Sequence, residues 1–206
     1  MKKIYAVILA AGTSSRLGFN KLTVRIDGKS VVVRAVEPFC FDGIDKIFVV
    51  TNPDVTGVER ELAQTACSTK VSLIYNENYR QGMSSSIKTA LPSIEDGDAV
   101  FLHLGDKPFV RRELVSGMIG VYLSGNSRII VPEYEGEKGH PVLIRIGPRI
   151  IEEMESLEGD RGLREIIDKH QEDMVFIEGD EGTIFDIDTV DALSTLRKRG
   201  HKVEES

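Results

Sequence analysis

The sequence predicts a single α/β domain with three layers, in which helices cover both faces of a mainly parallel sheet. Three observations support this prediction. Short apolar runs alternate with helical patterns in the early part of the chain, which is typical of βαβ units. The chain has 206 residues, enough to bury one core without disulfides or metals. Its polar motifs follow the apolar runs, at the edge of the sheet where α/β proteins bind ligands.

Apolar runs predict the strands, and helical patterns between or after them predict the helices. We expect strands over residues 4–10, 47–50, 71–75, 99–104, 128–131, 142–146 and 174–177. We expect helices over residues 30–39, 57–66, 84–93, 111–123, 147–157, 161–170 and 189–198, and Thr189 is suited to cap the last one. With right-handed crossovers this order gives a Rossmann-like fold over residues 1–200. Residues 201–206 are expected to form a C-terminal tail that is frayed from Lys202 onward.

Charge and composition exclude several classes of partner. The formal net charge is −7, and the longest basic run is Arg197-Lys198-Arg199, which disfavours a nucleic-acid surface. The apolar N-terminal run is short and passes straight into a charged loop, unlike a signal peptide, and no run is long enough to span a membrane. Cys40 and Cys67 form no C-x-x-C unit, so we expect two buried thiols in a cytoplasmic protein.

An apolar strand runs directly into a Gly/Ser loop at residues 7–21, which read VILAAGTSSRLGFNK. Gly12 and Gly18 let backbone N–H groups converge on an anion, and the loop adds positive charge through Arg16 and an exposed Lys21. Lysine does not directly follow the second glycine, so the loop is not a Walker A motif, and it lacks G-x-G-x-x-G. The loop therefore predicts a polyphosphate site; the alternative is an ordinary βα turn with surface charges.

Acidic residues stand at two further predicted edges of the sheet. In VFLHLGDKPFV, Asp106 follows a buried strand, where a carboxylate suits Mg²⁺ together with phosphate oxygens; the alternative is an Asp that caps a turn. In IFDIDTVDAL, strand alternation places Asp186 and Asp188 on one face, just before the last helix. One of these two suffices for a metal, which leaves the other to orient it or to cap backbone groups.

Three other motifs each allow a structural and a functional interpretation. In YRQGMSSSIKTAL, the serines at a helix start read a base or ribose, or simply cap the helix. His140 in KGHPVLI and Arg161 in GDRGLREII either belong to structural turns or face a ligand. His103, inside an apolar strand, is expected to be a hydrogen-bonded core histidine, and no His/Cys set has zinc spacing.

The motif L-A-A-G-x-S-x-R-x-G-x-x-K resembles the signature loop of the MobA-like nucleotidyltransferases, which join an NTP to a phosphate or sugar phosphate. Five ordered motifs carry this resemblance over residues 4–196. L-A-A-G and G-M-S-S-S are similar to the molybdopterin cytidylyltransferase branch, whereas L-A-G-G is typical of the guanylyltransferases. Lys107 departs from the family, which commonly has Gln between the aspartate and proline of G-D-x-P; it either assists phosphate binding or points outward.

The resemblance implies roles for individual residues. Arg16 and Lys21 would neutralise the triphosphate. Asp106 and Asp188 would hold a metal, which is Mg²⁺ or alternatively Mn²⁺. The nucleotide-binding residues that the resemblance implies are Leu9, Ala10, Ala11, Gly12, Arg16, Lys21, Gly82, Ser84 and Ser85.

The implied reaction is transfer of CMP from CTP to a molybdopterin-type phosphate, with release of pyrophosphate. His140 and Arg161 would face this acceptor. Within the enzyme class, the alternatives are a GTP-using guanylyltransferase of the molybdenum cofactor or phospholactate type and a sugar-phosphate transferase. Outside it, the alternative is a non-catalytic chaperone that holds the cofactor in contact with a molybdoenzyme. A chaperone has no need of both the loop cations and the paired carboxylates, which favours the enzyme.

Overall fold

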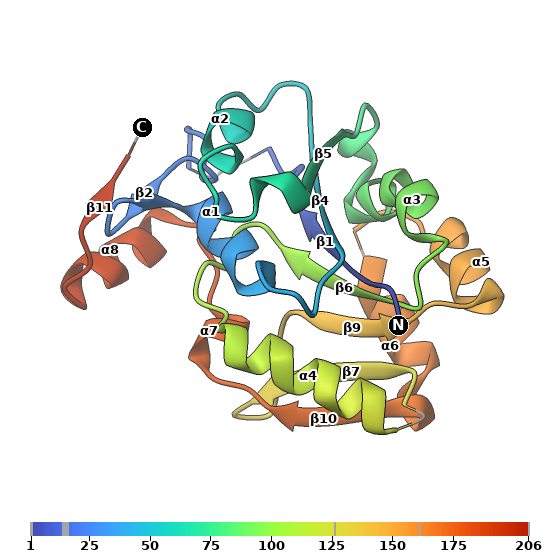
Figure 1. The fold of residues 1–206 in the computed structure, drawn as a ribbon. Coiled ribbons are helices and arrows are strands. Elements are labelled where there is room, and N and C mark those ends of the chain that lie inside the picture. Colours follow the sequence, from blue (N-terminus) through green and yellow to red (C-terminus); the bar gives the residue numbers. More distant parts are fainter. Residues whose placement is uncertain (1, 14–16, 126, 161, 206) are drawn as a thin grey trace.

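The computed structural model describes residues 2–13, 17–125, 127–160 and 162–205 and shows helices on both faces of a central sheet (Figure 1). The strands of this sheet are β1 (Ile4–Leu9), β4 (Lys46–Thr51), β5 (Val71–Tyr75), β6 (Ala99–Leu104), β7 (Ile129–Tyr134), β8 (Glu137–Lys138), β9 (Val142–Arg145) and β10 (Met174–Glu178). Their order is β10-β7-β9-β6-β1-β4-β5, with β8 paired to β7. Neighbouring strands are parallel except at β8 and β9, so the predicted mainly parallel sheet is confirmed.

Two groups of helices cover the two faces of this sheet. Alternate side chains of β1 point to opposite faces, so Ala6 enters one buried apolar cluster and Val7 enters another. The cluster around Ala6 includes side chains of α1 (Val31–Val36), α2 (Val58–Leu62) and α4 (Arg112–Ser124). The cluster around Val7 includes side chains of α3 (Met83–Ile94), α5 (Pro148–Ser156) and α6 (Gly162–Lys169). The three predicted layers are therefore confirmed.

The C-terminal residues form part of a second, smaller sheet, so the prediction of a frayed tail is wrong. This sheet has the order β11-β2-β3, and its strands are β2 (Arg25–Ile26), β3 (Lys29–Ser30) and β11 (Val203–Glu204). Asp27 follows β2; its Oδ1 accepts a hydrogen bond from the Lys202 N–H at 2.9 Å, and its own N–H donates to the Lys202 carbonyl at 2.8 Å. Two-residue strands are too short to give an alternating pattern, so the sequence did not predict them.

The remaining helices are short or lie near the C-terminus. Among them are η3 (Tyr79–Gln81), η4 (Gln171–Asp173), α7 (Glu181–Ile184) and α8 (Val190–Lys198). As predicted, α8 begins after Thr189, whose hydroxyl accepts a hydrogen bond from the Ala192 N–H at 3.2 Å. Among the described residues, no helix is both long and apolar enough to cross a membrane.

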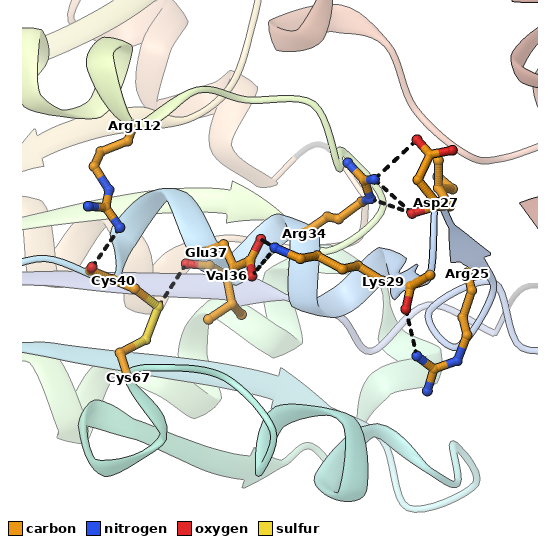
Figure 2. A network of polar contacts seen from close by, with 11 residues as sticks. Arg25, Asp27, Lys29, Arg34, Val36, Glu37, Cys40, Cys67 and Arg112 are labelled. Atoms are coloured by element: carbon orange, nitrogen blue, oxygen red, sulfur yellow. Dashed lines mark hydrogen bonds and ion pairs between the residues drawn. A yellow bond between two sulfur atoms is a disulfide. The ribbon is translucent and has the colours of Figure 1, made fainter. Parts of the chain in front are cut away.

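A disulfide joins Cys40 and Cys67, so the prediction of two buried thiols is wrong. Cys40 follows η1 (Glu37–Phe39) and Cys67 precedes η2 (Ser68–Lys70); their Cα atoms lie 5.4 Å apart, within the usual range for disulfides. Figure 2 shows this bond and the Arg112 side chain, whose Nη2 donates to the Cys40 carbonyl at 2.9 Å. No spacing motif in the sequence predicts this disulfide, because the two cysteines approach each other only in the folded chain, where α1 packs on α2.

Candidate active site

A cavity of about 530 Å³ lies at the carboxyl ends of β1 and β6. These neighbouring strands end at Leu9 and Leu104, and the Gly105 N–H donates to the Leu9 carbonyl at 2.9 Å. A Cβ on Gly105 would lie 2.9 Å from the Ala10 Cβ, so the two turns approach this closely because position 105 is glycine. The described residues that line the cavity are Leu9, Ala10, Ala11, Gly12, Thr13, Lys21, Leu22, Tyr79, Arg80, Gly82, Met83, Ser86, Leu104, Asp106, Asp160, Asp186 and Asp188.

Lys21 lies between two aspartates in this cavity. Its ammonium donates hydrogen bonds to Asp106 Oδ2 and Asp188 Oδ1, each at 2.5 Å. The Lys21 side chain is only 12% exposed, so the expectation of an exposed lysine is wrong. Burial alone would lower the Lys21 pKa, but the charges and hydrogen bonds of the two aspartates outweigh burial and raise this pKa above its ordinary value. The first loop and the two predicted acidic motifs therefore meet at one point.

The segment that carries Asp186 and Asp188 is not a strand, which corrects the strand alternation from which both side chains were placed on one face. It connects α7 to α8, and the Ile187 side chain between the two aspartates is fully buried in a third apolar cluster that also contains α8 side chains. Because Ile187 points into this cluster, both aspartates point the other way and line the cavity. The Ile187 N–H also donates to the Asp106 carbonyl at 2.9 Å, which ties the two acidic segments together.

Lys107 is buried, and its ammonium also lies near the acidic segment that carries Asp186 and Asp188. Its side chain is 7% exposed, and its ammonium donates to the Ile184 carbonyl at 2.5 Å and lies 3.7 Å from Asp186 Oδ2. Burial lowers the Lys107 pKa, although the neighbouring aspartates oppose the change. Burial raises the Asp186 pKa. The charges of Asp106 and Asp188 raise it further, whereas the charge of Lys107 lowers it. Lys107 therefore does not point outward, nor is it among the described residues that line the cavity.

The residues around Lys21 suit a divalent cation that binds oxygen ligands. Asp106 Oδ1 is buried and has no hydrogen-bond partner among the described residues, which leaves a carboxylate oxygen available for a ligand. Asp106 Oδ2 and Asp188 Oδ1 already converge on one positive group, the Lys21 ammonium. The described residues hold no cluster of three or more His, Cys, Asp or Glu arranged for a metal. Two carboxylates fit a Mg²⁺ or Mn²⁺ ion whose other ligands are phosphate oxygens and water.

The start of α3 closes another side of the cavity. Gly82, its N-cap residue, has φ +95°, and a Cβ there would lie 2.6 Å from the Gly159 carbonyl carbon, so only glycine fits. Gly82 lines the cavity together with Ser86, and its predicted contact with the nucleotide stays a prediction. Ser84 and Ser85 instead line a separate cavity of about 500 Å³. The Ser85 hydroxyl donates to the Gly82 carbonyl at 2.8 Å, and a nucleotide contact by Ser84 or Ser85 stays a prediction.

Of the two predicted acceptor residues, the structure describes only His140, and it does not place His140 in this cavity. Arg161 and Arg16 lie outside the described residues. The His140 Nδ1 atom lies 3.5 Å from the Leu102 carbonyl, and His140 is not among the described residues that line the cavity. Burial, aided by the Lys107 charge, lowers the His140 pKa to about 4. An acceptor contact by His140 or Arg161 therefore stays a prediction.

His103 is a core residue, as predicted. It is fully buried, and its Nε2 lies 3.2 Å from the Lys107 carbonyl, so this nitrogen donates the hydrogen bond. The ring centroids of His103 and His140 lie 6.4 Å apart. Burial, together with the charges of His140 and Lys107, lowers the His103 pKa to about 3.

Sequence reasoning missed several residues that line the cavity. Arg80 and Tyr79 form part of η3, and with Thr13 they also line a second cavity of about 530 Å³. Asp160 accepts a hydrogen bond from the Met83 N–H at 3.2 Å and so joins the α5–α6 connection to the start of α3. Arg80 stands in the motif YRQGMSSS, of which the prediction used the glycine and the serines, and Asp160 stands in GDRG, of which it used Arg161.

Fold and site together define an α/β protein with a cavity at the carboxyl edge of its sheet, where α/β proteins bind ligands, and in this cavity a loop lysine lies between two carboxylates. The chain belongs to the MobA-like NTP transferase family, because residues 6–174 match the family model described as the MobA-like NTP transferase domain. It is accordingly a nucleotidyltransferase, and the resemblance of the opening motif is confirmed.

Relatives at full and partial length agree with this class. Molybdenum cofactor cytidylyltransferase of Escherichia coli is 26% identical over 202 residues, 97% of this chain and 98% of the relative. A 2-C-methyl-D-erythritol 4-phosphate cytidylyltransferase of Clostridium tetani is 31% identical over 122 residues, 56% of this chain and 48% of the relative. A protein described as "Probable molybdenum cofactor guanylyltransferase", of Natranaerobius thermophilus, is 28% identical over 133 residues, 65% of this chain and 62% of the relative.

A solved structure supports the fold. Rv0371c of Mycobacterium tuberculosis, crystallised in complex with manganese, superposes with a TM-score of 0.76 at 21% identity and covers 96% of this chain and 98% of its own. At 21% sequence identity, this structural similarity supports the fold of the chain and not its function.

Proposed function

We propose that this nucleotidyltransferase transfers CMP from CTP to a molybdopterin-type phosphate monoester and releases pyrophosphate, with Mg²⁺ or Mn²⁺ as its metal. The observation that carries the proposal is the Lys21 ammonium held between Asp106 and Asp188 at the carboxyl edge of the sheet. A site that gathers one flexible cation and two carboxylates suits a triphosphate with its metal. The cavity of about 530 Å³ lies within the size range of ligand sites.

Two observations support CTP and the acceptor class. L-A-A-G and G-M-S-S-S are similar to the cytidine-using branch of the family, and the relative that matches along nearly the whole chain is a molybdenum cofactor cytidylyltransferase. Gly82 leaves the start of α3 close to the α5–α6 connection, which closes this side of the cavity with backbone groups. A pocket closed by backbone groups suits a pyrimidine, and it leaves the polar edge of a larger purine unpaired.

The chemistry needs positioning and charge stabilisation more than proton transfer. A phosphate monoester is already largely ionised at neutral pH, so one of its oxygens attacks the α-phosphorus of CTP without a general base. A new phosphoanhydride bond forms as the bond to the β-phosphate bridging oxygen breaks, and pyrophosphate carries away the electron pair. Asp106 and Asp188 would hold the metal, which supplies charge neutralisation at the reacting phosphates. Lys21, displaced from its two aspartates, would then stabilise the triphosphate.

The proposal is tested by measuring pyrophosphate release with each of the four NTPs, in the presence of Mg²⁺ and a molybdopterin-type phosphate. We expect release with CTP that depends on both the acceptor and the metal. Replacing the acceptor by 2-C-methyl-D-erythritol 4-phosphate should abolish it. Release with that sugar-alcohol phosphate instead would move the chain to the sugar-phosphate alternative, and no release with any NTP would favour the chaperone.

A guanylyltransferase is the second candidate, and a specific observation favours it. The chain also matches the guanylyltransferase relative of Natranaerobius thermophilus over 65% of its length. The two candidates differ in kcat/KM for CTP and GTP, where we expect a preference for CTP of at least about tenfold. An equal or higher kcat/KM with GTP would overturn the cytidylyltransferase proposal in favour of this candidate.

A further inference from the structure

Four aspartates line one cavity. Asp160 accepts a hydrogen bond from the Met83 N–H, and the other three are divided between two lysines. Lys21 contacts Asp106 and Asp188 at 2.5 Å each. Asp186 is held apart from that group, and its Oδ2 lies 3.7 Å from the Lys107 ammonium. The same short segment therefore offers two carboxylates to the cavity, and each of them has a different lysine as partner.

Lys107 is the fixed member of its ion pair. Its side chain is 7% exposed and leaves the turn directly after Asp106, and its ammonium donates to the Ile184 carbonyl at 2.5 Å. Its own carbonyl accepts the hydrogen bond from His103 Nε2 at 3.2 Å. Asp186, by contrast, is 47% exposed. Because an ammonium this deeply buried needs a nearby carboxylate, Lys107 draws Asp186 toward itself.

We propose that Lys107 is a positioning residue that keeps Asp186 out of the coordination of the metal site formed by Asp106 and Asp188. The inference rests on the proposed function, because it takes Asp106 and Asp188 as the metal ligands. Two carboxylates then match the charge of one divalent cation, and phosphate oxygens of the nucleotide can complete its coordination. Without Lys107, Asp186 becomes a third carboxylate ligand, and the metal binds more tightly even without nucleotide.

The positioning role can be distinguished from a simple effect of the Asp186 charge on metal binding, because the two predict different results for the same variants. If Asp186 acted only through its charge, the Asp186→Asn substitution would weaken metal binding by the same factor whether or not Lys107 is present. If Lys107 holds Asp186 away, the substitution has little effect in the parent protein and a large effect once Lys107 is gone. A double-mutant cycle measures this coupling directly.

The experiment titrates the purified full chain with Mn²⁺ alone and measures free Mn²⁺ by electron paramagnetic resonance. We expect Lys107→Gln to lower the Mn²⁺ Kd about tenfold. Asp186→Asn alone should change the Mn²⁺ Kd by less than about threefold. In the double variant Lys107→Gln/Asp186→Asn, the roughly tenfold fall in Kd caused by Lys107→Gln should disappear. Lys29→Gln is the matched control: it removes a lysine that contacts Glu37 at 2.7 Å on the surface (Figure 2), and its Kd should equal that of the parent.

Additive effects, or an unchanged Kd in Lys107→Gln, would overturn the positioning role. Lys107→Met provides a second route if the glutamine variant does not fold, as judged by circular dichroism. If neither folds, Asp186→Asn alone still decides, because a loss of Mn²⁺ affinity greater than about threefold in the parent background contradicts the proposal. The Asp106→Asn variant distinguishes failure of the positioning role from failure of the proposed function. If this variant binds Mn²⁺ as tightly as the parent, Asp106 is not a metal ligand, and the proposed function fails as well.

Discussion

Replacing Lys21 by alanine tests whether the loop lysine is part of the site. The substitution removes the ammonium that Asp106 and Asp188 both contact at 2.5 Å. Breaking a deeply buried ion pair costs roughly 3–5 kcal/mol, and the 39% exposure of Asp188 reduces this to about 2 kcal/mol. In a chain of this size, each kcal/mol corresponds to roughly 2–4 °C, so we expect Tm to fall by about 4–8 °C.

Thermal unfolding, followed by fluorescence with and without Mn²⁺, measures this effect. The cation should raise Tm more in Lys21→Ala than in the parent, because it takes the place of the ammonium between the two carboxylates. In isothermal titration, Lys21→Ala should bind CTP about tenfold more weakly than the parent, since one phosphate contact is lost. Lys29→Ala is the control: its lysine is 54% exposed, so its loss should cost less than about 1 kcal/mol and leave CTP binding unchanged.

A Tm of Lys21→Ala within about 1 °C of the parent would mean that the aspartates are not held by Lys21. An unchanged affinity for CTP would refute the reasoning about the opening loop itself.

The remaining predictions concern the two carboxylates, the disulfide and a buried histidine. Asp106→Asn and Asp188→Ala should each lower kcat for pyrophosphate release by at least about a hundredfold while circular dichroism shows a folded chain; full activity in either variant would remove that residue from the mechanism. Reduction of the Cys40–Cys67 bond, which spans 27 residues, should lower the free energy of unfolding in urea by roughly 3–4 kcal/mol, and an equal midpoint with and without reductant would contradict this. Burial lowers the His103 pKa to about 3 from an ordinary 6.5, so the unfolded chain binds a proton that the folded chain excludes. The contribution of His103 to stability is therefore complete above about pH 6.5 and is lost as the pH falls towards 3; His103→Gln should flatten this acid dependence in urea titrations, and a slope equal to that of the parent would disprove it.

The sequence predicted the parts of the fold that depend on long, regular patterns. β1 is apolar along its whole length, and β6 is apolar except at His103, because both faces of the sheet are covered; this pattern is visible without a structure. Lys21 and Asp106 were found for the same reason, since each follows a buried strand whose end could be predicted. The carboxyl ends of parallel strands meet at one edge, so the convergence of these residues followed.

The missed features depend on contacts between distant parts of the chain. Whether Lys107 bends inward or outward is decided by the Ile184 carbonyl, which lies 77 residues away. Which serine faces the cavity is decided by the rotation of α3 about its axis, which packing sets, and the cavity is lined by Ser86 instead of Ser84 and Ser85. Local spacing carries no information on either point.

The antiparallel strand β9 affects how the chain folds as it is made. The ribosome releases β1, β4, β5 and β6 first, and these four strands are consecutive neighbours that can pair in the order of their synthesis. β7 follows them but lies one place further out, because β9 occupies the position beside β6. The outer edge of β6 therefore stays without its partner until β9 has emerged, and an open apolar edge can recruit other chains. Cotranslational aggregation should thus be greatest for nascent chains that end between β6 and β9.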